Sequence, residues 1–240
     1  GFLKPMTVLF AATLLLMIEP DFGATVIVVG TAFGMLFMAG VRLGHFLLVL
    51  LGALGALLVL VVSEPYRVKR LTAYTDPWAD PYNTGFQLTQ SLIAFGRGEW
   101  FGVGLGDSVQ KLFYLPEAHT DFVFAVFAEE FGLIGSFVLI ALFMALVWRI
   151  FRLAIRAHDA ERLFEAYLAI GLGAWFGLQA FINVGVNMGL LPTKGLTLPL
   201  ISYGRSSLIV TMVCIGLLLR IHHELAVDAK PVNRKRGRKK

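Results

Sequence analysis

The side chains best suited to chemistry gather just before a long apolar block. Lys111, Glu117, His119 and Asp121 follow a segment in which glycines at 102, 104 and 106 let the backbone turn sharply. No predicted strand precedes these glycines, so the spacing does not indicate a dinucleotide site. The charged residues instead indicate acid–base chemistry or the binding of a charged substrate.

Asp121 stands where the chain enters the apolar block, and two compatible roles follow from that place. Asp is a good N-cap, so one role is to begin the following helix. A carboxylate at an interface is also partly desolvated, which raises its pKa toward that of a working general base. The sequence leaves both roles open.

Glu129 and Glu130 follow in the same block, about 12–14 Å further along a helix. Each carboxylate inside a span costs roughly 2.5–3.5 kcal/mol, so both should face other helices or a cavity. Either a hydrogen-bonded structural site or a part in catalysis or transport would account for them.

Basic and hydroxyl side chains flank this region on both sides in sequence. The basic cluster at 67–70 and Lys111 suit either lipid phosphates or a substrate that carries a pyrophosphate. The serines after the connection 187–205 either cap a tight turn or form a second wall of the same site. No metal ligand set is predicted. The candidate substrate-binding residues are Arg67, Arg70, Lys111, Glu117, His119, Ser206 and Ser207, with Asp121 as the candidate catalytic residue.

The elements that position these residues are predicted to be membrane-spanning helices. Of the 240 residues, 57% are apolar and 15% are charged, whereas about a quarter are charged in soluble domains. The apolar blocks approach the roughly 20 residues needed to cross a bilayer, where only a helix pairs all its backbone groups. We predict an all-α integral membrane protein, a polytopic transmembrane helix bundle with one large extracytoplasmic loop. The six predicted spans are Pro5–Ile18, Phe22–Ala39, Leu43–Ser63, Phe122–Trp148, Leu163–Val186 and Ser206–Ile221.

Basic residues mark one side of the predicted bundle. Lys4, Arg42, the segment 149–162 and the C-terminal tail share that side if each block crosses once. The positive-inside rule makes it cytoplasmic, so both ends of the chain are predicted to be cytoplasmic. Residues 1–225 form the predicted bundle and residues 226–240 a basic tail. Its seven Lys and Arg favour anionic lipid over nucleic acid as a neighbour.

The segment 64–121 is the predicted external loop. It holds about 58 residues, five of them basic and seven acidic, so it lacks a basic excess. Loops of this length are usually functional or disordered, and the many aromatic residues argue against disorder. The apolar residues between Phe86 and Phe95 predict a short amphipathic stretch that lies in the membrane interface.

Six ordered motifs closely resemble the SEDS family (shape, elongation, division, sporulation), the multi-span glycan polymerases of bacterial cell walls. The resemblance covers essentially the whole chain, and two motifs, Leu115–Asp121 and Leu191–Pro199, look more like the cell-division branch than the elongation branch. Family members have ten spans, so this chain resembles the last six. The matching segments are Glu19–Gly23, Tyr66–Leu71, Asp76–Pro77, Gly102–Gln110, Lys111–Glu130 and Leu190–Ser207.

The resemblance implies a peptidoglycan glycosyltransferase that polymerises lipid II into β-1,4 glycan strands at the division septum of the bacterial cytoplasmic membrane. Asp121 matches the family's catalytic carboxylate, and basic residues would neutralise the departing pyrophosphate. The resemblance implies no definite cofactor, although a divalent cation such as Mg²⁺ or Mn²⁺ would suit the pyrophosphate. The implied partners are a class B penicillin-binding protein and other membrane proteins of the division machinery.

Three departures from the family pattern and two rival functions remain. Glu19 and Asp107 are mild changes, but Arg205 replaces a glycine and would strain the turn if that position has a positive φ.

One rival function is a flippase for the lipid-linked precursor, which would depend on charges at mid-depth such as Glu129 and Glu130. The other is a non-catalytic scaffold, which would tolerate the loss of Asp121.

Overall fold

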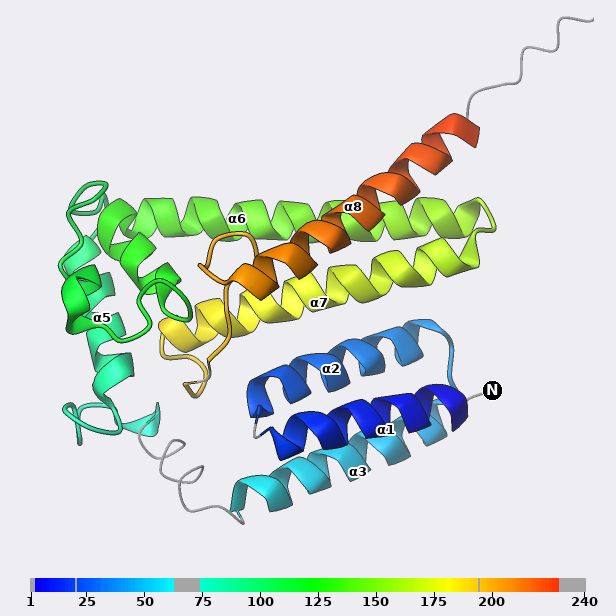
Figure 1. Cartoon of the computed structure of the whole chain (residues 1–240), viewed down its shortest axis with the longest axis horizontal. Coiled ribbons are helices and arrows are strands. Elements are labelled where there is room, and N and C mark those ends of the chain that lie inside the picture. The colour runs from blue at the N-terminus through cyan, green and yellow to red at the C-terminus, as the bar shows by residue number, and fades with distance from the viewer. Residues whose placement is uncertain (1–2, 20, 63–73, 194, 229–240) are drawn as a thin grey trace, which may run out of the picture.

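A computed structural model of the chain describes residues 3–19, 21–62, 74–193 and 195–228, and every regular element within these ranges is helical (Figure 1). The predicted all-α fold is therefore confirmed. A shorter helix, α5 (Phe86–Gly98), and a π-helical turn, η1 (Gln110–Tyr114), lie between α3 and α6 in the sequence. The six apolar helices are α1 (Leu3–Ile18), α2 (Phe22–Met38), α3 (Leu43–Val62), α6 (Val123–Asp159), α7 (Leu163–Asn187) and α8 (Arg205–Asp228).

The apolar helices occur where the spans were predicted. By length and composition α6, α7 and residues Arg205–Val227 of α8 can each cross a membrane, whereas the described apolar stretches of α1 to α3 are shorter. Large apolar side chains such as Phe10, Leu48 and Leu142 are more than half exposed, at 70%, 71% and 62%. Such a surface suits a helix that faces lipid.

Two boundaries differ from the prediction. Helix α6 continues from Trp148 to Asp159, through most of the segment 149–162 that was predicted as a link between spans. No glycine or proline interrupts this segment, and the basic residues in its last turn complement the helix dipole. Helix α8 reaches Asp228, seven residues past Ile221, where the last predicted span ends.

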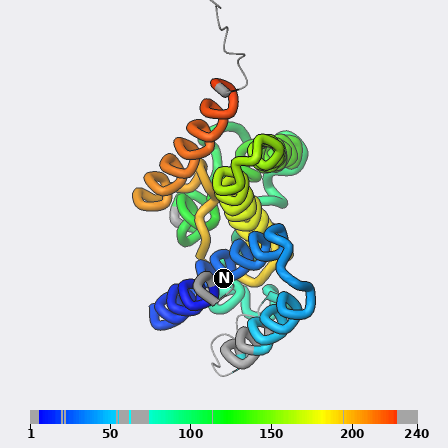
Figure 2. Tube along the Cα trace, turned by 90° about the vertical axis from the view of Figure 1, so that its right-hand side faces the viewer, coloured from blue at the N-terminus to red at the C-terminus, as the bar shows by residue number. Residues whose placement is uncertain are grey.

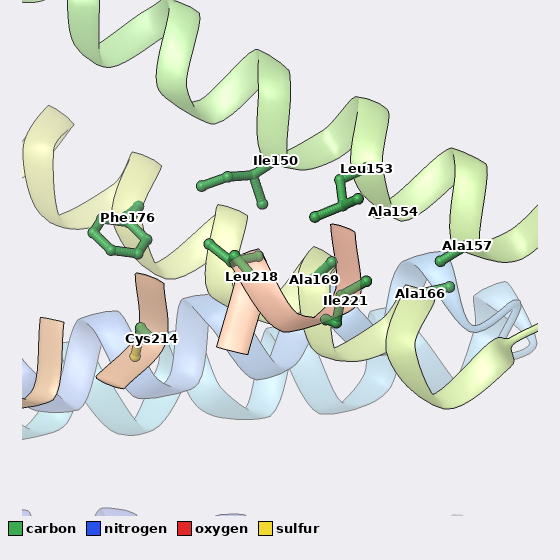
Figure 3. Close-up of a cluster of buried hydrophobic side chains, with 10 residues drawn as sticks. All are labelled: Ile150, Leu153, Ala154, Ala157, Ala166, Ala169, Phe176, Cys214, Leu218 and Ile221. Atoms are coloured by element: carbon green, nitrogen blue, oxygen red, sulfur yellow. The ribbon is translucent and has the colours of Figure 1, made fainter. Parts of the chain in front are cut away.

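The antiparallel pair α6 and α7 forms the centre of the molecule (Figure 1). Helix α2 packs along α7, α1 and α3 flank α2, and α8 lies on the other side of α7 from these three helices (Figure 2). A buried apolar cluster joins α6, α7 and α8 at the end away from Asp121 (Figure 3). Its larger members are Ile150, Leu153, Phe176, Leu218 and Ile221.

The described part of the long loop is well structured. Its amphipathic stretch is the helix α5, which crosses the first turns of α6 and buries Leu88 and Ala94 to 2% and 0% exposure. The apolar face of α5 therefore packs against α6 and α7, a contact that the predicted place in the interface did not include.

A break in α6 anchors the segment that follows α5. Gly132 has φ +67°, and the backbone groups freed there pair with residues 99–104. An apolar environment demands such pairing, because unsatisfied amides have no water to bind. The four hydrogen bonds run from Val103 N to Glu129 O (3.0 Å), Gly104 N to Glu130 O (3.1 Å), Leu133 N to Glu99 O (2.9 Å) and Ile134 N to Trp100 O (3.2 Å).

The close crossing of α5 and α6 generates a test of this packing. A Cβ at Gly98 would lie 2.1 Å from the carbonyl oxygen of Ala128, a rigid backbone atom. We expect Gly98→Ala to lower the free energy of unfolding by about 1–3 kcal/mol, as overpacking does. Thermal unfolding of the detergent-solubilised protein measures it.

The matched control lies two residues earlier in the same helix. A Cβ at Gly96 would meet no atom within 4 Å, so Gly96→Ala should be neutral or slightly stabilising. Equal melting temperatures for the two variants would contradict the close crossing.

Candidate active site around Asp121

Asp121 lies in the turn before α6, with its backbone and its side chain in different surroundings. The α6 helix has no side-chain cap, so the N-cap role considered for Asp121 is wrong. Among the residues that the structure describes, the Asp121 carboxylate has no hydrogen-bond partner, whereas its backbone carbonyl accepts two hydrogen bonds. The carboxylate is therefore free to accept a proton from another molecule.

Two asparagines of α7 hold the Asp121 backbone. Asn183 Nδ2 and Asn187 Nδ2 donate to the Asp121 carbonyl over 2.8 and 2.9 Å. Asn187 Oδ1 also accepts from the Ala125 amide in the first turn of α6 (3.0 Å). Both asparagines are almost fully buried, at 1% and 0% exposure, so these bonds are shielded from water. They fix the start of α6 against the end of α7.

A third amide on the same face of α7 extends this arrangement to the loop between α7 and α8. Gln179 Nε2 donates to the Thr197 carbonyl (2.9 Å), and Asn183 also donates to the Leu196 carbonyl. The spacing of four residues places 179, 183 and 187 on one helix face. We define these three residues as the amide row.

The loop held by the amide row covers one side of the Asp121 carboxylate. A Cβ at Gly195 would lie 2.8 Å from Asp121 Oδ2, so the loop backbone lies directly against the carboxylate. Ser202 Oγ donates to the Thr120 carbonyl (2.6 Å), and the Tyr203 amide donates to the His119 carbonyl (2.8 Å). The loop is thus tied to the two residues that precede Asp121.

The surroundings of Asp121 favour its protonated form. Burial raises the pKa of the Asp121 carboxyl to about 6, with further contributions from the negative charges of Glu117 and Asp21. Asp21 caps α2 by accepting a hydrogen bond from the Ala24 amide (2.9 Å), so α2 also borders the site. A carboxyl with this pKa is mostly ionised at neutral pH and is basic enough for proton transfer.

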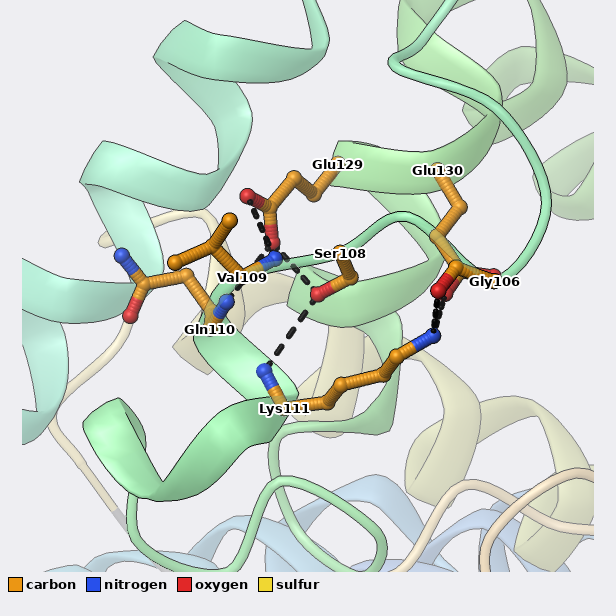
Figure 4. A network of polar contacts seen from close by, with 7 residues as sticks. All are labelled: Gly106, Ser108, Val109, Gln110, Lys111, Glu129 and Glu130. Atoms are coloured by element: carbon orange, nitrogen blue, oxygen red, sulfur yellow. Dashed lines mark hydrogen bonds and ion pairs between the residues drawn. The ribbon is translucent and has the colours of Figure 1, made fainter.

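The two carboxylates within α6 are structural. Glu129, with 0% exposure, accepts from Ser108 Oγ (2.5 Å) and from the amides of Val109 and Gln110 (3.2 Å each) (Figure 4). It also lies 3.3 Å from Arg97. These contacts hold the start of the π-helical turn. Of the two roles left open for the pair, hydrogen-bonded structural sites fit these contacts.

Lys111 belongs to the same structural network. Its ammonium pairs with Glu130 at 2.7 Å and donates to the Gly106 carbonyl at 2.5 Å (Figure 4). The contact with Glu130 ties the π-helical turn to α6, so a substrate phosphate would have to share this ammonium.

The other predicted site residues fall into three groups. Glu117 and His119 are exposed on the turn that leads to Asp121, and Glu117 accepts from Thr120 Oγ1 (2.7 Å). Ser207 lies 3.1 Å from Thr197 in the loop that covers Asp121, and Ser206 is its exposed neighbour in α8. Arg67 and Arg70 lie outside the described residues.

Arg205 does not strain the last loop. It is the first residue of α8 and is not among the described residues with a positive φ, and its Nε donates to the Tyr203 hydroxyl at 3.4 Å. The condition for strain, a positive φ at this position, is therefore not met.

Sequence reasoning missed the amide row, although a signal was present. Three amide side chains at intervals of four in an apolar span mark one polar face, which must meet a partner inside the bundle. A metal site does not emerge, because the described residues contain no group of three His, Cys, Asp or Glu side chains able to hold an ion.

The model of the FtsW, RodA and SpoVE family, described as cell cycle protein, matches residues 1–227. The chain belongs to this family. The predicted family resemblance is confirmed, and with it the multi-pass membrane fold.

Similar relatives named probable peptidoglycan glycosyltransferase FtsW support the predicted nearness to the cell-division branch. Over 97% of its own length, this chain is 58% identical to the relative from Thioalkalivibrio sulfidiphilus. Over 93% of its own length, it is 62% identical to the relative from Nitrosococcus halophilus. It covers 58% of each relative, so the chain spans somewhat more than half the length of the curated relatives it matches.

Two solved structures share the fold. One, titled as the structural coordination of polymerization and crosslinking by a peptidoglycan synthase complex, superposes with a TM-score of 0.73 at 32% identity, over 93% of this chain and 62% of that one. The rod shape determining protein RodA of Thermus thermophilus gives a TM-score of 0.61 at 30% identity, over 93% of this chain and 56% of that one.

The amide row generates a prediction about stability. Asn187→Ala removes one of the two hydrogen bonds to the Asp121 carbonyl. It also removes the side-chain acceptor of the buried Ala125 amide, which keeps only the Phe122 carbonyl at 3.0 Å. We expect the free energy of unfolding to fall by about 1–3 kcal/mol, because two buried hydrogen bonds are lost at about 0.5–1.5 kcal/mol each. Chemical or thermal unfolding in detergent measures the change.

Asn83→Ala is the control, because Asn83 is exposed and its side chain donates a hydrogen bond to the partly exposed Asp80 (2.9 Å). Equal stability of the Asn187 and Asn83 variants would show that the amide row does not anchor Asp121.

Proposed function

We propose that the chain carries the active site of a peptidoglycan glycosyltransferase that polymerises lipid II into β-1,4 glycan strands during septal cell-wall synthesis. The observation that supports this most directly is the Asp121 carboxylate, which lies without a described hydrogen-bond partner on a rigidly held backbone. The family, with relatives named peptidoglycan glycosyltransferase, supplies the class of reaction.

In the proposed reaction the 4-hydroxyl of the acceptor sugar attacks the anomeric carbon of the donor strand. The new C–O bond forms as the bond from that carbon to the pyrophosphate breaks, so the α-linked donor gives a β-1,4 product. Asp121 accepts the hydroxyl proton, a contribution typically worth 10²–10⁴-fold in rate. The pyrophosphate leaves with both bonding electrons and needs cations more than a strong acid.

The departing pyrophosphate needs cationic groups close to it. Arg67 and Arg70 are our candidates, because guanidinium groups pair strongly with phosphate oxygens. Lys111 already pairs with Glu130, and its part is to hold the loop near the site and share its charge with the phosphates. No step is assigned to a metal, since the described residues offer no set of ligands.

The surroundings of the reaction follow from the proposed function. We infer that the protein acts in the bacterial cytoplasmic membrane at the division septum, with both ends of this segment cytoplasmic and Asp121 outside. A class B penicillin-binding protein is the proposed partner, alongside other membrane proteins of the division machinery. One of the similar solved structures is of a peptidoglycan synthase complex that coordinates polymerization and crosslinking, and this likeness supports such a pairing.

Replacing Asp121 tests its role as the base. Asp121→Asn keeps the size of the side chain but removes its ability to accept the proton, so polymerisation should fall by about 10²-fold or more. Full-length protein with its partner is incubated with lipid II, and glycan length is measured on gels at matched expression and melting temperature.

Product equal to that of the native protein would refute Asp121 as the base. If neither form polymerised while lipid II still crossed vesicle membranes, a flippase would be the better conclusion. If neither activity were found, a scaffold would remain.

A further prediction concerns the pH dependence of the polymerisation rate. Because the base must be ionised, the rate should fall as the pH drops through about 6, the pKa of Asp121. Glu117→Gln removes a negative charge that raises this pKa, so the acidic limb of the pH–rate profile should move to lower pH.

Asp21→Asn serves as the graded control, since Asp21 contributes less than Glu117 and Asn can still cap α2. The acidic limb of the pH–rate profile of this variant should also move to lower pH, but by a smaller amount. A limb that stays in place or moves to higher pH in the Glu117 variant would contradict this account.

A further inference from the structure

The end of α6 remote from Asp121 extends beyond what a bilayer core requires. The continuous part after the break at Gly132, residues 133–159, spans about 40 Å, whereas the hydrocarbon core is about 30 Å thick. Trp148, which is 58% exposed, and the basic residues after it are the types that gather at the membrane interface. The last turns of α6 therefore lie at the level of the lipid headgroups.

A groove of about 540 Å³ opens at this level between α6 and α8. Three arginines on one face of α6, at 149, 152 and 156, line it together with His222 of α8. Its remaining walls are mostly apolar, and Ile150, Leu153 and Leu218 in its floor belong to the buried cluster of Figure 3. The groove thus combines a row of cations with apolar walls.

The charge of these arginines is not neutralised within the described chain. None of the three lies within 4.0 Å of a described carboxylate oxygen, and Arg152 instead stacks over the Trp148 ring at 4.8 Å. Nearby, Arg162 and Arg220 both pair with Glu224, at 3.0 and 2.5 Å. The same end of the bundle therefore supplies a carboxylate for those two arginines and none for the row along the groove.

We propose that this groove binds the phosphate of an anionic membrane phospholipid, with the acyl chains along its apolar walls. Guanidinium groups pair with phosphate oxygens through two parallel hydrogen bonds, and basic pockets between helices suit anionic headgroups. A free anion would leave the apolar walls without a contact. The headgroup of a zwitterionic lipid would bring its own positive charge toward the arginines, which repel it. The inference does not depend on the proposed catalytic activity.

Phospholipid retention by the full-length protein tests the proposal. The protein in neutral detergent is titrated with phosphatidylglycerol or phosphatidylcholine, and bound lipid is counted by native mass spectrometry. We expect selective retention of phosphatidylglycerol and, for Arg149→Gln/Arg156→Gln, roughly a ten- to thirtyfold weaker affinity, at about 1 kcal/mol per lost cation. The variant Arg149→Lys/Arg156→Lys should keep most of the affinity because it keeps the charge.

The matched control, Arg42→Gln/Arg220→Gln, removes the same charge outside the groove and should bind like the native protein. Four results would overturn the proposal. These are equal retention of phosphatidylcholine, unchanged affinity in the Arg149/Arg156 double Gln variant, an equal loss in the control, and displacement of the lipid by millimolar inorganic phosphate. Melting temperatures confirm that the variants fold, and the Lys variant separates loss of charge from loss of structure.

Discussion

The hydrogen bonds from α7 to the Asp121 carbonyl are the constraint on which the candidate site depends. Inside an apolar bundle a polar side chain must find a partner, and Asn183 and Asn187 find theirs in the turn before α6. Gln179 does the same for the loop after α7. Because one helix face holds both segments, the carboxylate of Asp121 has a fixed position while no described hydrogen bond occupies it.

A second constraint acts where α6 breaks at Gly132. The freed amides and carbonyls cannot turn to water, so residues 99–104 lie against them and pair with them. Glu129 and Glu130 then hold the following turn through Ser108 and Lys111. The polar segment between α5 and α6 is thereby folded back onto the helix it precedes, and the catalytic candidate stands at its end.

The sequence predicts the helices well because apolar blocks have a physical cause that needs no tertiary context. It also indicates Asp121, since a carboxylate at the edge of a span is costly without a use. It cannot distinguish a side-chain cap from a backbone held by asparagines, because both place Asp121 at the same position. The end of α6 was missed for a similar reason, since a basic segment can link two helices or continue one. Strain at Arg205 would require a positive φ, and the sequence does not give the sign of this angle.

The pattern of satisfied and unsatisfied charges favours an enzyme over a conduit. A transport path needs polar groups that exchange partners at mid-depth, yet Glu129 is fully buried and holds three hydrogen bonds and an arginine. Freeing it for a passing substrate would expose a buried charge without its partners, which is strongly unfavourable. The Asp121 carboxylate, by contrast, lacks a described hydrogen-bond partner and lies at the edge of α6, with burial and two acidic neighbours raising its pKa. In the reaction that we propose, a proton acceptor placed there would act on a substrate whose sugars lie outside the membrane while its lipid stays in the bilayer.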